Sequence, residues 1–212
     1  MSDGVVEMYL QCCVKGIAGA TEPGGVGLTK DEAKALILDD VGILSNWWRN
    51  KVRISPQEVA EVLTEANLDR HLHDYARFGD ETPFISLACG AVERDAVVRY
   101  NWVRSAIDTA LMFATDSWTR PGALFYVWVA TSHRPAVALQ AVAEPVRDLN
   151  IYWRWSPHQP EGEVTAKVHI PANQIEKLEW WMPTSSGGRV EETIPNPCYV
   201  SAEQLSDVRA LF

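Results

Sequence analysis

Two carboxylates separated by one residue, Glu161 and Glu163, are the side chains whose types and spacing most directly suggest chemistry in this sequence. A mostly apolar, β-branched run follows at residues 164–170 and predicts a strand that Glu163 opens. Because side chains alternate along a strand, both carboxylates can face the same side. Paired carboxylates at such a place can stabilise a developing positive charge. The alternative interpretation is a solvated acidic turn before an edge strand.

An aromatic loop precedes the acidic pair and carries Trp153, Trp155 and His158. Indole rings can stack on a planar ligand or acceptor, and they can equally serve as packing residues. Trp155 is therefore a candidate ligand contact, with plain packing as the alternative.

The acidic pair belongs to a longer pattern, which comprises Ser156-Pro157-His158, Glu161-x-Glu163-Val164, Ile170-Pro171 and Gln174-Ile175. With this spacing, residues 156–175 resemble the catalytic segment of the heat-labile enterotoxin and cholera toxin A-chain family of mono-ADP-ribosyltransferases. The order and spacing of elements stay similar to the family over roughly residues 70–181.

That resemblance implies a fold and an activity. The fold is an α+β, ADP-ribosyltransferase-like fold of two packed, mostly antiparallel sheets with N-terminal helices, in a single domain over residues 1–212. The activity is transfer of ADP-ribose from NAD to an acceptor protein or small molecule, or hydrolysis of NAD. NAD would accordingly be bound as a substrate.

The resemblance also assigns roles by position. Glu163 is the family's essential glutamate, which stabilises the oxocarbenium-like centre formed when the nicotinamide–ribose bond breaks. Glu161 would orient or deprotonate the nucleophile, and a glutamate there goes with arginine-type acceptors. Ser86, in a strand predicted at residues 84–89, would hydrogen-bond Glu163, and Trp155 would stack on the nicotinamide.

Two positions depart from the family pattern. After Ser86, the family's threonine and second serine are absent. The first strand, predicted at residues 5–14, lacks the arginine that contacts the dinucleotide phosphate in the family. Gln11 is the candidate cofactor-binding residue there, since it can donate a hydrogen bond, but it carries no charge. Lys15 would reach the same point only in a different register.

These departures leave more than one class of function open. The first is an active mono-ADP-ribosyltransferase or NAD glycohydrolase. The second is a catalytically degenerate binding module of the same fold, which recognises a protein partner through its tryptophan-rich face. A third is an unrelated α+β hydrolase, for which the sequence carries no G-x-S-x-G nucleophile motif.

The composition limits the class of protein further. A length of 212 residues, with 47% hydrophobic and 22% charged residues, suits one globular domain with a substantial core. The net charge of −9 argues against nucleic-acid binding through a general basic field. Four cysteines without a zinc-type spacing indicate reduced thiols and no metal site.

The sequence shows neither a signal-peptide pattern nor an apolar run approaching the roughly eighteen residues of a membrane span. We therefore expect a soluble protein that acts in the cytoplasm, or one that is delivered without a classical signal peptide. No membrane partner is predicted, and the oligomeric state is left open.

The remaining elements follow from periodicity and capping. Thr29 and Glu32 form a capping box that opens a helix predicted to run to about residue 48, after a glycine-rich loop at residues 15–28. Ser55-Pro56 opens the next helix. Further predictions are a helix at residues 93–116, a fully buried strand at 124–131 and an edge strand at 189–194.

Two histidines, His71 and His73, lie near the end of the helical region. Side chains two residues apart on a helix do not face each other, so a shared metal site is not expected. We interpret both as surface helix residues.

Overall fold

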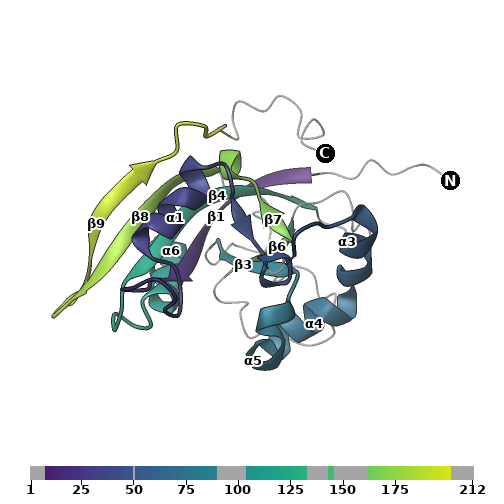
Figure 1. The fold of residues 1–212 in the computed structure, drawn as a ribbon, viewed down its shortest axis with the longest axis horizontal. Helices are drawn as coiled ribbons and strands as arrows, with labels where there is room; N and C mark the ends of the chain where they lie inside the picture. Colours follow the sequence, from purple (N-terminus) through teal and green to yellow (C-terminus); the bar gives the residue numbers. More distant parts are fainter. Residues whose placement is uncertain (1–7, 50, 90–103, 133–142, 146–161, 202–212) are drawn as a thin grey trace.

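The computed structural model describes residues 8–49, 51–89, 104–132, 143–145 and 162–201 (Figure 1). Within these residues the strands are β1 (Met8–Ala18), β2 (Ile43–Leu44), β3 (Phe84–Ala88), β4 (Gly122–Ser132), β5 (Ala143–Pro145), β6 (Glu163–Lys167), β7 (His169–Ile170), β8 (Ile175–Thr184) and β9 (Gly187–Pro195). The helices are α1 (Lys30–Leu38), α2 (Asn46–Arg49), α3 (Pro56–Val62), α4 (Glu65–His73), α5 (Tyr75–Phe78) and α6 (Arg104–Ala114), with 3-10 turns η1 (Gly79–Glu81) and η3 (Ala172–Gln174). The predicted α+β class is confirmed.

Seven strands form one continuous sheet in the order β1-β3-β6-β5-β4-β8-β9. Because β1 also pairs with β4, five of these strands close into a ring. The pairings of the named strands are antiparallel except for β4 with β5. The two packed sheets of the prediction thus take the form of one sheet that turns back on itself, beside a two-stranded sheet of β2 and β7.

The main core lies between the two sides of this folded sheet. It brings together side chains from strands on both sides, such as Cys13, Ile85, Phe125, Val164 and Leu178. β4 lies at its centre, and residues 121–130 are all buried, as predicted for a strand covered on both faces. Burial of so much apolar surface supplies most of the driving force for the fold.

β1 is longer than the sequence suggested. Its pairing with β4 continues through Lys15, opposite Phe125, to Ala18, opposite Gly122. The loop predicted at residues 15–28 therefore begins only after Ala18. A Cβ atom at Gly16 would collide with the carbonyl of Ala110, so this glycine lets α6 pack directly on the strand.

The helix predicted from Thr29 to about residue 48 is split into three elements. Its capping box is present, but α1 ends at Leu38, and the chain continues through Asp40 (φ 56°) and Gly42 (φ 73°). A helix cannot pass through left-handed residues. Gly42 is also confined by the carbonyl of Ile170, where β2 pairs with β7.

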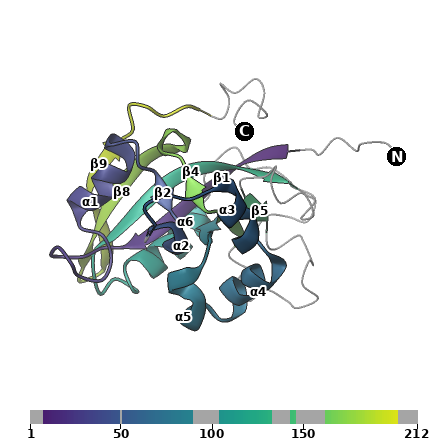
Figure 2. The same ribbon diagram turned by 45° about the vertical axis from the view of Figure 1, so that its right-hand side comes forward.

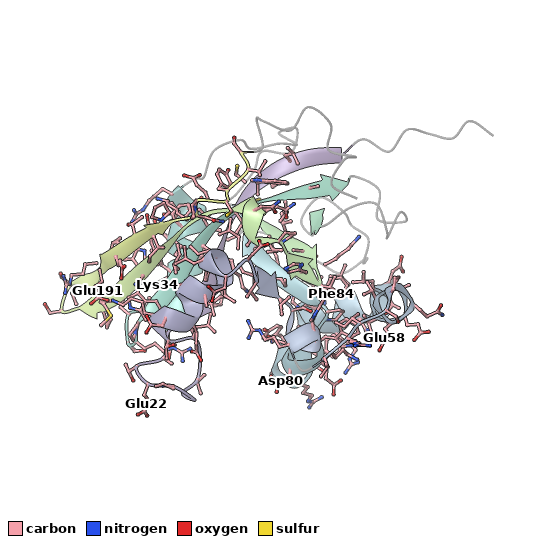
Figure 3. The ribbon with its side chains drawn as sticks, turned by 45° about the horizontal axis from the view of Figure 1, so that its top comes forward. Glu22, Lys34, Glu58, Asp80, Phe84 and Glu191 are labelled. Carbon is pink, nitrogen blue, oxygen red and sulfur yellow. The ribbon has the colours of Figure 1, made fainter. Side chains whose placement is uncertain are left out.

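The two ends of the molecule differ in architecture. Figure 1 shows the long β8–β9 hairpin, with α1 beside it, at one end and α3 to α5 at the other. Lysines of α1 form exposed ion pairs with β9, Lys30 with Glu191 at 3.0 Å and Lys34 with Glu192 at 2.9 Å. Figure 3 shows Lys34 and Glu191 close together on this hairpin side. β9 is the outer strand of the sheet, as predicted.

Helices α3, α4 and α5 lie together on the side of the molecule away from the β8–β9 hairpin, as Figure 2 shows. The predicted cap at Ser55 is present and starts α3, and Thr64 caps α4 separately. Leu68 and Leu72 of α4 pack on Phe84, the first residue of β3. α4 is therefore fixed against the strand that carries Ser86. Within the described residues, no helix has the length and apolar character needed to cross a membrane.

Candidate functional site

Glu163 is the first residue of β6, a strand flanked by β3 on one side and β5 on the other. Its side chain is buried, with the residue 5% exposed. A solvated turn before an edge strand is therefore excluded as an account of Glu163. Glu161 and Trp155 lie outside the described residues, so their predicted roles stay predictions.

Ser86 lies on the same face of the sheet as Glu163. In the β3–β6 ladder Ser86 is opposite Thr165 and Ala88 is opposite Glu163, which makes Ser86 and Glu163 diagonal neighbours. The imidazole of His71, from α4, contacts both of them. Its Nε2 atom is 2.9 Å from Ser86 Oγ and 3.8 Å from Glu163 Oε1.

The other ring nitrogen of His71 is also bonded. Nδ1 lies 2.9 Å from Thr82 Oγ1, and that oxygen accepts a hydrogen bond from the backbone N–H of Phe84 at 3.2 Å. The ring packs edge-on against Tyr75 and at a tilt against Phe84, with centroid distances of 5.5 and 5.7 Å. Both ring nitrogens therefore have a partner, and two aromatic rings pack against the imidazole.

The interpretation of His71 as a surface residue is wrong, because the residue is only 3% exposed. His73 is exposed, as expected. The difference follows from helix geometry: His71 shares the buried face of α4 with Leu68 and Leu72, at spacings of three and four residues. That apolar stripe was the signal in the sequence that could have identified His71.

Lys15, rather than Gln11, is the polar residue of β1 that lies near Ser86, His71 and Glu163. Lys15 lines a cavity together with Ser86, His71 and Glu163. Gln11 is buried four residues earlier, where its Nε2 donates to the carbonyl of Cys12 at 3.3 Å, and it does not line the cavity.

The environment of Lys15 is electrostatically unusual. Desolvation by burial and then the nearby charge of Arg49 lower the pKa of Lys15 to about 8, while the charge of Glu163 partly offsets this shift. Lys15 thus lies within electrostatic range of one cation and one carboxylate. Arg49, at the end of α2, lines the same cavity.

The cavity has a volume of about 630 Å³, within the usual range for small-molecule and cofactor sites. Two polar atoms in its wall, Ser45 Oγ and Arg120 Nε, are buried and have no hydrogen-bond partner among the described residues. Buried polar atoms of this kind favour a ligand that completes their bonding. Val26 and Phe113, which are 80% and 63% exposed, form an apolar part of its lining.

The cavity lining carries charges of both signs. Glu163 supplies a buried carboxylate. Ser86 and His71, which hydrogen-bond to each other, lie beside it. Lys15 and Arg49 supply two cationic groups, to which Arg120 adds a third. A ligand that suits such a site has an anionic part and a separate centre on which positive charge develops.

Comparisons with known proteins give likeness in structure only. No protein-family model matches the chain, and no curated protein matches it. Among solved structures, it is similar to EcPltA, with a TM-score of 0.47 and 12% identity over 93% of this chain and 89% of that chain. It is also similar to the A subunit of a heat-labile enterotoxin mutant in which lysine replaces an arginine, with a TM-score of 0.42 and 18% identity over 91% of this chain and 78% of that chain.

Proposed function

We propose that this protein cleaves the nicotinamide–ribose bond of NAD and transfers ADP-ribose to an acceptor or to water. The observation that carries the proposal is the burial of Glu163 in the wall of a cavity that also presents Lys15 and Arg49. The resemblance of residues 156–175 to the catalytic segment of enterotoxin-type mono-ADP-ribosyltransferases supports the same reaction.

Glu163 stabilises the transition state. As the bond from the ribose anomeric carbon to the nicotinamide nitrogen lengthens, nicotinamide leaves with the bonding electron pair, and the ribose becomes oxocarbenium-like. A carboxylate that is already fixed and largely removed from water stabilises that charge more strongly than a solvated one. The buried start of β6 supplies such a position.

Lys15 and Arg49 bind the pyrophosphate. Lys15 supplies the positive charge that β1 would otherwise lack, since the first strand has no arginine. Arg49 can form a bidentate contact with phosphate oxygens, for which its planar guanidinium is suited. Arg120 is a further donor on the same cavity wall.

The acceptor completes the reaction. Its nucleophilic atom forms the new bond to the anomeric carbon and loses a proton, which Glu161 accepts by analogy with the family. With an arginine-type acceptor the product is a mono-ADP-ribosylated protein or small molecule, and with water it is ADP-ribose.

Release of nicotinamide from labelled NAD tests the proposal. Glu163→Gln keeps the size of the side chain and removes its charge, and we expect kcat to fall by about a hundredfold to a thousandfold. Glu176→Gln, the same change at a half-buried position on β8, is the matched control and should keep wild-type turnover. Equal turnover in Glu163→Gln and wild type contradicts the proposal, and NAD binding without any cleavage supports the binding-module alternative.

A further inference from the structure

We infer that Cys13 and Cys89 are a redox-active pair, which forms a disulfide between β1 and β3 when the protein folds in the presence of a small-molecule disulfide such as glutathione disulfide. The inference goes beyond the proposed function and does not depend on it. Its basis is the register of the two strands, the core cluster that both residues share, and their burial. Both thiols are free in the structure, which therefore shows the reduced form of the pair.

The strand register places the two cysteines directly opposite each other. Val14 of β1 pairs with Ala88 of β3 in an antiparallel ladder. One residue back along β1 and one residue forward along β3, the next opposed residues are Cys13 and Cys89. Both belong to the same buried core cluster, so their side chains lie on the same face of the sheet.

The backbone hydrogen bond of Cys89 shows which type of opposed pair this is. Its N–H donates to the carbonyl of Gly162 at 3.1 Å, on the β6 side of β3 and away from β1. Cys13 and Cys89 are therefore a non-hydrogen-bonded pair, in which the Cα atoms lie about 4.5 Å apart and the side chains are closest. A disulfide needs Cα atoms about 4.4–6.8 Å apart, so the bond can form without a large movement of either strand.

The two thiols are close together and shielded from solvent. Cys13 is 1% exposed and Cys89 is 2% exposed. Burial raises the pKa of the Cys13 thiol, and the Cys89 thiol, within hydrogen-bonding range, raises this pKa further. Cys12 lies outside this core cluster, because its side chain points to the other face of β1, and Cys198 is exposed. The fold thus brings Cys13 and Cys89 together and keeps them apart from Cys198.

Formation of the bond is a thiol–disulfide exchange. The thiolate of one cysteine attacks a sulfur of glutathione disulfide, which forms a mixed disulfide and releases one glutathione. The thiolate of the second cysteine attacks the protein sulfur of that mixed disulfide and releases the second glutathione. The two cysteine protons pass to the two glutathione thiols, so the protein loses two electrons and the oxidant gains them. Because both protein thiols are buried after folding, we expect the exchange to occur while the chain folds.

The disulfide reinforces a short junction of the sheet. Among the described residues, β1 and β3 pair at a single position, whereas β1 pairs with β4 along its whole length. The β1–β3 junction nevertheless closes the ring of five strands. A covalent bond next to this junction holds the two strands together. It also restricts the unfolded chain, because it joins residues that are far apart in the sequence.

Oxidative refolding of the full-length protein tests the inference. The reduced, unfolded chain is returned to native conditions in a mixture of glutathione and glutathione disulfide, and the remaining free thiols are then alkylated. We expect peptide mapping without reductant to show a disulfide between Cys13 and Cys89, which is lost after reduction. The oxidised protein should have a Tm about 5–15 °C above that of the reduced protein.

Alanine variants identify the two partners. Cys12→Ala is the matched control, because it removes the neighbouring thiol of β1 and should keep both the disulfide and the higher Tm. Cys13→Ala and Cys89→Ala should each lose both. Fragment spectra of the wild-type peptides decide between Cys12 and Cys13 even if a variant does not fold. A disulfide that uses Cys12 or Cys198 overturns the inference, as does refolded wild-type protein with both Cys13 and Cys89 alkylated. An oxidised protein that melts no higher than the reduced one also overturns it.

Discussion

The two parts of the cavity are built in different ways. At the carboxylate end, short hydrogen bonds join His71 to Ser86 and Thr82, and the β3–β6 ladder places Ser86 beside Glu163. At the cationic end, Lys15 and Arg49 form no ion pair among the described residues, and their charges repel each other. The carboxylate end is thus organised before a ligand arrives, whereas the cationic end is completed by one. We expect substitutions at the first to change kcat and substitutions at the second to change KM.

The largest effect on ligand binding should come from Lys15→Met, which removes the cation of β1. Loss of a charge-assisted hydrogen bond to phosphate costs about 1.5–3 kcal/mol, so KM for NAD should rise by about tenfold to a hundredfold while kcat changes little. Lys15→Arg is the matched variant and should keep a low KM. A large loss of kcat with unchanged KM in Lys15→Met would contradict the assignment of Lys15 to ligand binding.

Ser86→Ala should have a smaller effect, and on kcat rather than on KM. The alanine removes one donor beside Glu163 while the His71 ring keeps its bond to Thr82. We expect kcat to fall by about tenfold, with KM for NAD within about twofold of wild type. Thermal unfolding of the variant serves as the control for folding. A change confined to KM would place Ser86 with the cationic end instead.

The pH dependence of binding should report Lys15 directly. Because its pKa is lowered to about 8, Lys15 is charged below this pH and neutral above it. The affinity for ADP-ribose, which lacks the cleavable nicotinamide bond, should therefore fall by up to about tenfold as the pH rises from 7 to 9. Lys15→Arg should abolish this fall, since arginine stays protonated. Calorimetric titrations that show the same pH dependence in both proteins contradict the assignment.

The smallest effect should come from Lys34→Ala, which breaks an exposed ion pair between α1 and β9. Surface pairs of this type stabilise a protein by about 0–1 kcal/mol. Denaturant unfolding should show a change of that size or less, and both kcat and KM should stay at wild-type values. Any loss of turnover would mean that the ion pair between α1 and β9 affects the groups in the cavity.

The sequence predicted the residues whose positions depend on local pattern. The family resemblance singled out Glu163 and Ser86, which lie on the same face of the sheet, and the cap motifs located the starts of α1 and α3. The strand at residues 124–131 was recognisable because its apolar, β-branched composition demands burial.

Features that depend on tertiary packing were missed. The glycines that follow Lys15 predict a loop there, whereas pairing with β4 extends the strand to Ala18. The spacing of His71 and His73 does not indicate burial, whereas Leu68 and Leu72 mark the face of α4 that points inward. No local sequence pattern indicates that β1 and α4, which are far apart in the sequence, border the same cavity.

A crystal structure with a non-cleavable carbocyclic analogue of NAD tests the central claim most directly. We predict the anomeric carbon of the nicotinamide ribose in contact with the Glu163 carboxylate. We also predict pyrophosphate oxygens at hydrogen-bonding distance, about 2.7–3.2 Å, from Lys15 or Arg49. A ligand bound outside this cavity, or one with its nicotinamide ribose at Lys15 and away from Glu163, would contradict the account.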